Sequence, residues 1–201
     1  MVRSRVALLA GWFSLQAAVG IAAELQLRVL DDADRPVADA VVYAVPRTPS
    51  TRPPRPAVMD QVDRQFMPRV LVIQRGAAVQ FPNRDNIRHQ VYSFSPANRF
   101  TLKLYAGRPA NPVVFPEAGV VVLGCNIHDS MVAWVLVVDT PYFARTDAAG
   151  AATLTGLEAG DYELRAWRAS MTSEPAGEAL SVGAANPGPR TLHVPAAPPA
   201  T

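Results

Sequence analysis

Three side chains that can bind a soft metal ion follow one another closely in the sequence. Cys125 is the only cysteine of the chain, and His128 and Met131 follow it at steps of three residues. In one loop or tight turn, every third residue tends to face the same side, so a thiolate, an imidazole and a thioether could converge. Upstream, His89 stands at the entrance of an expected strand. Two histidines, one cysteine and a weakly bound methionine are the ligand set of a type 1 copper site.

Each of these residues also has a simpler interpretation when it is taken alone. A buried cysteine is usually a small apolar filler, and a methionine usually packs in a core. A single histidine is more often a hydrogen-bonded polar residue than a ligand. The joint spacing of Cys125, His128 and Met131 between two strand-like runs favours the metal site. The third histidine, His193, lies near the Pro-rich end and is interpreted as a surface residue.

The segments around these residues predict an all-β protein. They are short, rich in Val, Phe and Tyr, and separated by Gly, Pro or Asn-Asp clusters, which favours a sandwich or barrel over βαβ units. No amphipathic helix of useful length is expected. Further strands are expected at LQLRVL and VADAVVYAV near the N-terminus and at ATLTGL and YELRAW near the C-terminus. Between these outer pairs, the expected strands are FMPRVLVIQRG, AAVQFPN, HQVYSF, FTLKLYA, PVVFPEAG, VVVLG and MVAWVLVVD.

Both ends of the chain carry signals of their own. Residues 1–23 have the charged start, apolar centre and small-residue end of a secretory signal peptide, with cleavage expected after Ala23. An uncleaved membrane anchor is disfavoured because Ser14 and Gln16 interrupt the apolar run. The Pro-rich residues 46–59 are interpreted as a linker, and residues 196–201 as a disordered tail.

The charge balance gives no support to nucleic-acid binding. The chain has 19 Lys and Arg against 17 Asp and Glu, and two of the arginines lie in the expected leader. Their removal leaves equal numbers of basic and acidic residues. The single cysteine excludes a disulfide within the chain. No metalloprotease motif or phosphate-binding glycine loop occurs, so we do not expect an enzyme.

Residues 60–139 resemble a cupredoxin of the plastocyanin type. The stretch FMPRVLVIQRGAAVQFPNRDNIRHQV is similar to the first half of such a domain, and GCNIHDSM is similar to its ligand loop, with the short spacing of amicyanin. The resemblance implies a Greek-key β-sandwich that holds one type 1 copper ion on His89, Cys125, His128 and Met131. It also implies that Asn83 and Gln90 support these ligands. Two residues depart from the pattern: Gln90 replaces a common Asn, and Asp129 replaces the Pro of amicyanin.

The flanking segments carry a second resemblance. LRVLDDADRPVADAVVYAV and TDAAGAATLTGLEAGDYELRAW are similar to the two halves of a carboxypeptidase-regulatory-like β-sandwich. The expected plan is therefore one small sandwich, formed by residues 24–45 and 140–195, with the cupredoxin inserted in it or packed beside it. Chains of this plan resemble periplasmic proteins of the methylamine utilisation protein family, which implies a periplasmic location.

The favoured function is single-electron transfer to or from a redox protein such as a c-type cytochrome or a periplasmic dehydrogenase. No nucleic-acid partner and no stable membrane insertion after signal cleavage are expected. His128 is the expected exit point of the electron, and a polar rim suits a transient encounter. Two alternatives remain open: a periplasmic copper chaperone, buffer or sensor that uses the same residues, and a structural or interaction β-sandwich without metal. The rim comprises Arg84, Asp85, Asn86, Arg88 and Asp129.

Overall fold

The computed structural model describes residues 22–169, 171, 176–183 and 185–197, and these form strands and loops without a helix. The all-β prediction is confirmed. Across this part of the chain, no helix is long and apolar enough to cross a membrane. The predicted signal peptide lies outside the described residues except for its last two positions, and so do residues 198–201 of the predicted tail.

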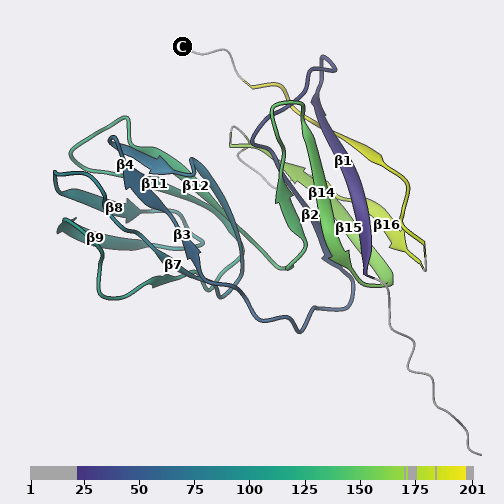
Figure 1. Cartoon of the computed structure of the whole chain (residues 1–201), viewed down its shortest axis with the longest axis horizontal. Coiled ribbons are helices and arrows are strands. Elements are labelled where there is room, and N and C mark those ends of the chain that lie inside the picture. Colours follow the sequence, from purple (N-terminus) through teal and green to yellow (C-terminus); the bar gives the residue numbers. More distant parts are fainter. Residues whose placement is uncertain (1–21, 170, 172–175, 184, 198–201) are drawn as a thin grey trace, which may run out of the picture.

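The chain forms two groups of sheets that lie side by side (Figure 1). The first unit combines strands from both ends of the described chain in two sheets, ordered β14-β1-β17 and β13-β2-β15-β16. Strand β1 pairs antiparallel with β14 and parallel with β17. The strands are β1 (Ala23–Asp31), β2 (Val41–Pro46), β13 (Phe143–Arg145), β14 (Ala151–Leu157), β15 (Gly160–Trp167), β16 (Glu178–Val182) and β17 (Arg190–Val194).

Alternation in the sequence explains how β1 is buried. Leu25, Leu27 and Val29 are all at most 4% exposed, whereas the residues between them face solvent. Because side chains of a strand alternate between its two faces, the apolar set packs against the other sheet of the first unit. The core between the two sheets also includes Leu154, Leu164 and further apolar residues of β14 to β17.

The second unit is built from one continuous stretch of chain. A five-stranded sheet, ordered β6-β12-β11-β8-β9, covers a core that is closed on the other side by the sheet β10-β7-β3. The hairpin β4-β5 stands beside them. The strands are β3 (Ala57–Val58), β4 (Asp60–Val62), β5 (Gln65–Met67), β6 (Val70–Gln74), β7 (Ala78–Gln80), β8 (His89–Ser93), β9 (Phe100–Tyr105), β10 (Val113–Val114), β11 (Gly119–Gly124) and β12 (Val132–Val138).

The start of the second unit differs from the expectation in two ways. Strand β3 already pairs with β7, and Met59 is completely buried, so this core begins before residue 60. The segment FMPRVLVIQRG forms two strands rather than one. Pro68 falls between β5 and β6, and its ring nitrogen has no hydrogen to donate to a strand ladder.

A third apolar cluster joins the two units. Val41 and Trp167 of the first unit pack with Val70, Leu136 and Val138 of the second, and all five are at most 5% exposed. The outward face of β6 and β12 is therefore covered by β2 and β15. The end of the second unit that holds β8 and the β11–β12 loop stays free of the first unit (Figure 1).

Asp31 makes the first unit sensitive to acid. Its carboxylate accepts hydrogen bonds from the backbone N–H groups of Ala33 (2.9 Å) and Arg35 (3.0 Å) and from Arg35 Nε (2.9 Å). These bonds, the side chain of Arg35 foremost, lower the pKa of Asp31 from 3.8 to about 2. Such a carboxyl group stabilises the fold above its unfolded pKa, and the contribution is lost as the pH falls toward its folded pKa.

We therefore expect the protein to lose stability between about pH 4 and pH 2 in part through Asp31. The variant Asp31→Asn should be less stable than the wild type at pH 7 and should lose less stability over that acid interval. Denaturant unfolding at several pH values measures both effects. Asp34→Asn is the matched control, because Asp34 is exposed and its φ of 57° suits asparagine. An unchanged acid slope in Asp31→Asn would contradict the assignment.

Candidate metal centre

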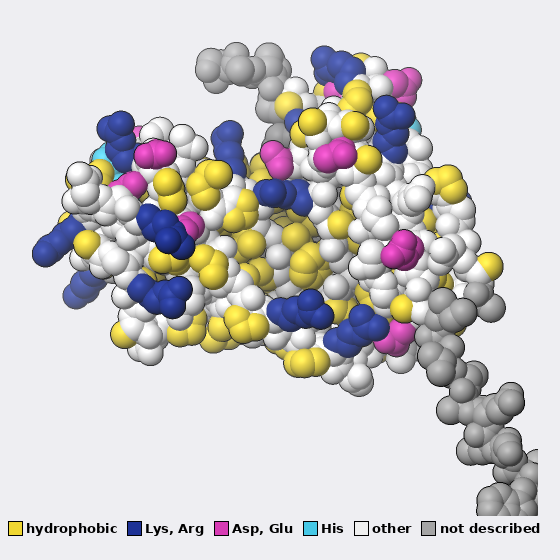
Figure 2. All heavy atoms as spheres, viewed as in Figure 1, with side chains coloured by type: hydrophobic (Ala, Val, Ile, Leu, Met, Phe, Trp, Pro, Cys, Tyr) yellow, Lys and Arg dark blue, Asp and Glu magenta, His cyan; other side chains and the backbone are white. Residues whose placement is uncertain are grey.

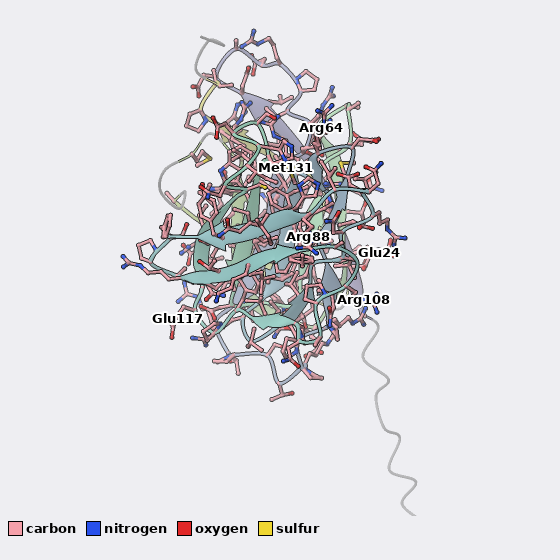
Figure 3. All side chains as sticks on the ribbon, turned by 90° about the vertical axis from the view of Figure 1, so that its left-hand side faces the viewer. Glu24, Arg64, Arg88, Arg108, Glu117 and Met131 are labelled. Atoms are coloured by element: carbon pink, nitrogen blue, oxygen red, sulfur yellow. The ribbon has the colours of Figure 1, made fainter. Side chains whose placement is uncertain are left out.

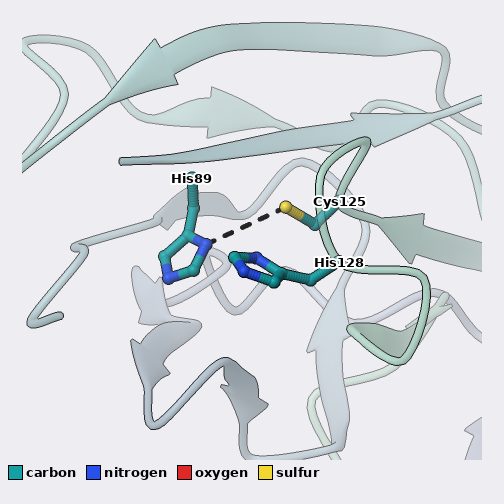
Figure 4. A group of neighbouring side chains, drawn as sticks. All are labelled: His89, Cys125 and His128. Carbon is teal, nitrogen blue, oxygen red and sulfur yellow. Dashed lines mark hydrogen bonds between the residues drawn. The ribbon is translucent and has the colours of Figure 1, made fainter. Parts of the chain in front are cut away.

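Three of the predicted ligands meet at the free end of the second unit. His89 is the first residue of β8, Cys125 directly follows β11, and His128 lies in the loop that leads to β12. One ligand atom from each, a ring nitrogen or the sulfur, lies within 4.8 Å of the other two. His89 Nδ1 is 3.9 Å from Cys125 Sγ, and the two imidazole rings meet edge to face with centroids 5.1 Å apart (Figure 4).

Burial closes most of this cluster from water. His89 is 0% exposed and Cys125 is 3% exposed, whereas His128 is half-buried. The Nδ1 atom of His128 is itself buried, and no hydrogen-bond partner for it occurs among the described residues. A buried ring nitrogen without a partner is costly unless something else binds it. The residues present therefore fit a bound metal ion.

Met131 is also buried, at 1% exposure, and belongs to the same core cluster as Cys125. Its backbone N–H donates to the carbonyl oxygen of His128 (2.9 Å), which closes a tight turn at the end of the loop. This turn carries the chain from the half-buried His128 into the start of β12. The role of Met131 as a weak ligand stays a prediction.

Asp85 lies inside the site and not on the rim, which corrects the sequence-based expectation. Its Oδ2 atom is 2.7 Å from His89 Nε2, and its side chain is only 12% exposed. An ionised carboxylate can only accept hydrogen bonds, so Nε2 carries a proton, and in the neutral ring Nδ1 then keeps its lone pair toward Cys125. Asp85 thus sets the tautomer that a metal ligand requires.

The same carboxylate also binds the turn between β4 and β5. It accepts hydrogen bonds from the backbone N–H groups of Asp63 (2.7 Å) and Arg64 (2.9 Å). Burial acts to raise the pKa of Asp85, but these bonds and the one from His89 bring it below its ordinary value. Asp85 is therefore ionised at neutral pH.

Asn83 fixes the loop that carries Asp85 toward His89. Its Nδ2 atom donates to the carbonyl oxygens of Ile87 (2.8 Å) and Tyr105 (2.9 Å), and its Oδ1 atom accepts from the backbone N–H of Asp85 (3.0 Å). Asn83 is 5% exposed and lies beside the cluster through these bonds, and its predicted support of the metal ligands stays a prediction.

Gln90 occupies the opposite face of β8. The alternation of this strand buries His89 and Val91 and leaves Gln90 only half-buried. Among the described residues, no hydrogen bond joins Gln90 to Cys125, so its predicted support of the thiolate stays a prediction. The other predicted rim residues, Arg84, Asn86, Arg88 and Asp129, are exposed as expected.

Sequence reasoning missed a buried polar pair next to the cluster. Gln61 is completely buried, and its Nε2 atom donates to the hydroxyl of Tyr105 (2.5 Å), which in turn donates to the carbonyl oxygen of Phe81 (2.6 Å). Burial raises the pKa of Tyr105 to about 12, and the nearby Cys125 acts in the same direction. No local pattern signals this pair, because Tyr105 comes beside the site only through its pairing with His89 across β8 and β9.

Comparison with known proteins found partial structural likenesses. No family model and no curated protein matches the chain. A copper-containing nitrite reductase (NirK) from Thermus scotoductus SA-01 is 24% identical with a TM-score of 0.40, over 42% of this chain but only 23% of that chain. A methionine-to-alanine mutant of amicyanin, in its Cu(I) form, is 24% identical over 41% of this chain and 81% of that chain, with a TM-score of 0.37. A purple cupredoxin from Nitrosopumilus maritimus is 22% identical over 41% and 99%, with a TM-score of 0.36.

Proposed function

We propose that the protein is a type 1 copper protein that transfers single electrons. His89, Cys125, His128 and Met131 hold one copper ion at the free end of the second unit. The observation that carries this proposal is the cluster of two ring nitrogens and one thiol sulfur within 4.8 Å. The protein belongs to the periplasm in this proposal, and residues 1–23 direct its export.

The chemistry of the donor set favours copper over zinc. Structural zinc sites use four cysteine or histidine ligands, whereas this cluster has three, with Met131 in the same core cluster as Cys125 as the proposed fourth. A thiolate and a thioether form a soft combination that suits Cu(I). The 3.9 Å between Cys125 Sγ and His89 Nδ1 also fits one shared ion. It is shorter than roughly 4.3 Å, the sum of a metal–sulfur and a metal–nitrogen bond in comparable sites.

Copper in such a site supplies a change of valence between Cu(I) and Cu(II) without a change of ligands. The side chains of the protein exclude water and orient the ligands. His89 and Cys125 are buried and exclude water, and Asp85 holds the ring of His89 through Nε2. His128 is the ligand with an exposed edge, so the electron enters or leaves there.

The burial of the cluster favours electron transfer over copper exchange. A chaperone or buffer must pass its ion to another protein through an open site, but His89 is 0% exposed and Cys125 only 3%. The exposed side chains around the cluster have mixed charges, which suits a weak encounter with a redox protein such as a c-type cytochrome or a periplasmic dehydrogenase.

The visible spectrum of the copper-loaded protein tests the proposal. We expect one equivalent of Cu(II) to produce an intense thiolate-to-copper band at about 600 nm, as in other sites with two histidines and one cysteine. Tight binding of Cu(I) without this band would indicate copper handling instead. The absence of any copper binding would leave the structural β-sandwich interpretation.

A further inference from the structure

A hollow of about 580 Å³ opens beside His128, on the side where the ligand loop faces the β4-β5 hairpin. This volume lies within the range of small-molecule binding sites. Its wall includes Arg64 from the hairpin turn, Arg69 from the loop before β6, and Ser130 from the ligand loop. Asp63 is the one acidic residue of the wall.

The backbone of the hairpin turn is held in an uncommon conformation. Asp63 and Arg64 both have positive φ angles, 53° and 57°, which residues other than glycine seldom adopt. The Asp85 carboxylate accepts hydrogen bonds from both of their N–H groups, so the fold supports this turn with a specific, partly buried side chain. The turn therefore presents Arg64 from a fixed backbone at the rim of the hollow.

The two arginines of the wall carry positive charges that the protein does not neutralise. Among the ion pairs of the described residues, Arg75 binds Asp139 and Arg84 binds Asp60, but none involves Arg64 or Arg69. The guanidinium of Arg69 instead lies over the ring of Trp134, 5.2 Å from its centroid, which is within the range of a cation–π contact. Figure 3 looks onto this end of the second unit and labels Arg64.

The distribution of charged side chains on the surface agrees with this arrangement. At the left-hand end of Figure 2, Lys and Arg side chains lie above and below a small area of histidine and acidic side chains. Two arginines with a serine hydroxyl and an imidazole edge form a set of hydrogen-bond donors for an oxyanion. Arginine binds planar carboxylates with particular geometric fit, through two parallel hydrogen bonds.

We propose that this hollow binds a carboxylate group next to His128. The geometry of the arginine side chains sets the class of anion. The planar fork of a guanidinium matches the two oxygens of a planar carboxylate, and two arginines against one aspartate leave the wall with a net positive charge that attracts an anion. Of the residues that line the hollow, only His128 belongs to the metal cluster, and binding of the carboxylate does not require copper.

Calorimetric titration of the metal-free protein with succinate, at constant ionic strength, tests the proposal. We expect saturable binding to one site. Arg64→Gln and Arg69→Gln should each weaken binding about tenfold, since each removes a charge-assisted hydrogen bond. Asp63→Asn should instead strengthen binding, and asparagine tolerates the positive φ of this position.

Arg99→Gln is the matched control, with the same loss of charge at a distant exposed position. Arg99 precedes the end of β9 that pairs with Ser93, whereas His89 pairs at the other end. If Arg99→Gln weakens binding as much as Arg64→Gln, the attraction is general and the site does not exist. Absence of saturable binding in all arms, or phosphate binding as tight as succinate, would also overturn the proposal.

A capped peptide of six glutamates distinguishes the source of the carboxylate. If the peptide and succinate both bind and both depend on Arg64, the hollow accepts a free carboxylate as well as one on a protein surface. If only the peptide binds, with the same dependence, the occupant is a side chain of an acidic protein. Because copper is absent in every arm, failure of this proposal leaves the copper spectrum, and so the proposed function, untouched.

Discussion

Replacement of Cys125 by serine is expected to abolish the absorption band at about 600 nm completely, because that band requires charge transfer from a thiolate to copper. A serine hydroxyl stays protonated at neutral pH and is a poor ligand for Cu(I). The side chains are nearly the same size, so the core around residue 125 should keep its shape. We expect a cooperative unfolding transition, with a loss of about 1–3 kcal/mol for the buried hydroxyl. Absorption and circular dichroism measure the two properties separately.

The matched control for this variant is His193→Gln. His193 lies on the exposed face of β17 in the first unit, so the band should keep its position and intensity. A wild-type band in Cys125→Ser would show that copper binds somewhere else. A weak band in both variants would point to copper bound at the surface.

Replacement of Asp85 by alanine is expected to cause a large loss of stability. The change removes the acceptor of three hydrogen bonds, two from backbone N–H groups of the hairpin turn and one from His89 Nε2. Water can reach the turn but not the completely buried His89. We therefore expect a loss of about 2–4 kcal/mol in the free energy of unfolding. Chemical denaturation of the metal-free protein measures this loss.

The variant Asp85→Asn separates the contribution of Asp85 to stability from its control of the His89 tautomer. An amide oxygen in place of Oδ1 can still accept from the N–H of Asp63, but an NH₂ group in place of Oδ2 loses the bond from Arg64. This NH₂ group faces His89 Nε2 and favours the tautomer with the proton on Nδ1. That tautomer cannot bind copper through Nδ1, so we expect roughly 10- to 100-fold weaker copper binding with a smaller loss of stability than in Asp85→Ala. Wild-type copper affinity in Asp85→Asn would contradict the role assigned to this residue.

The sequence predicts those parts of the fold and site that depend on local patterns. The alternation of β1 and the Val-rich run of β12 identify strands, because burial on one or both faces requires such patterns. The spacing of Cys125 and His128 in a single loop likewise predicts that they approach each other. The structure brings His89 to them through the pairing of β8 with β11.

The features that the sequence does not reveal depend on distant contacts. Asp85 looks like an exposed loop residue, and it turns inward because Asn83 holds the loop against Tyr105. The turn at Asp63 and Arg64 lacks glycine or asparagine, the usual signal for such a hairpin. Strand β17 completes a sheet by pairing parallel with β1, which lies at the other end of the described chain.

The interrupted plan of the first unit has a consequence for biosynthesis. Both neighbours of β1, namely β14 and β17, follow the second unit in the chain, and β2 likewise lies between β13 and β15. All strands of the second unit, by contrast, are contiguous. During synthesis, the segment that bears the metal ligands can therefore reach its native state before the partners of the N-terminal strands have been made. Premature termination between residue 138 and the start of β13 would leave an intact ligand cluster attached to unpaired N-terminal strands.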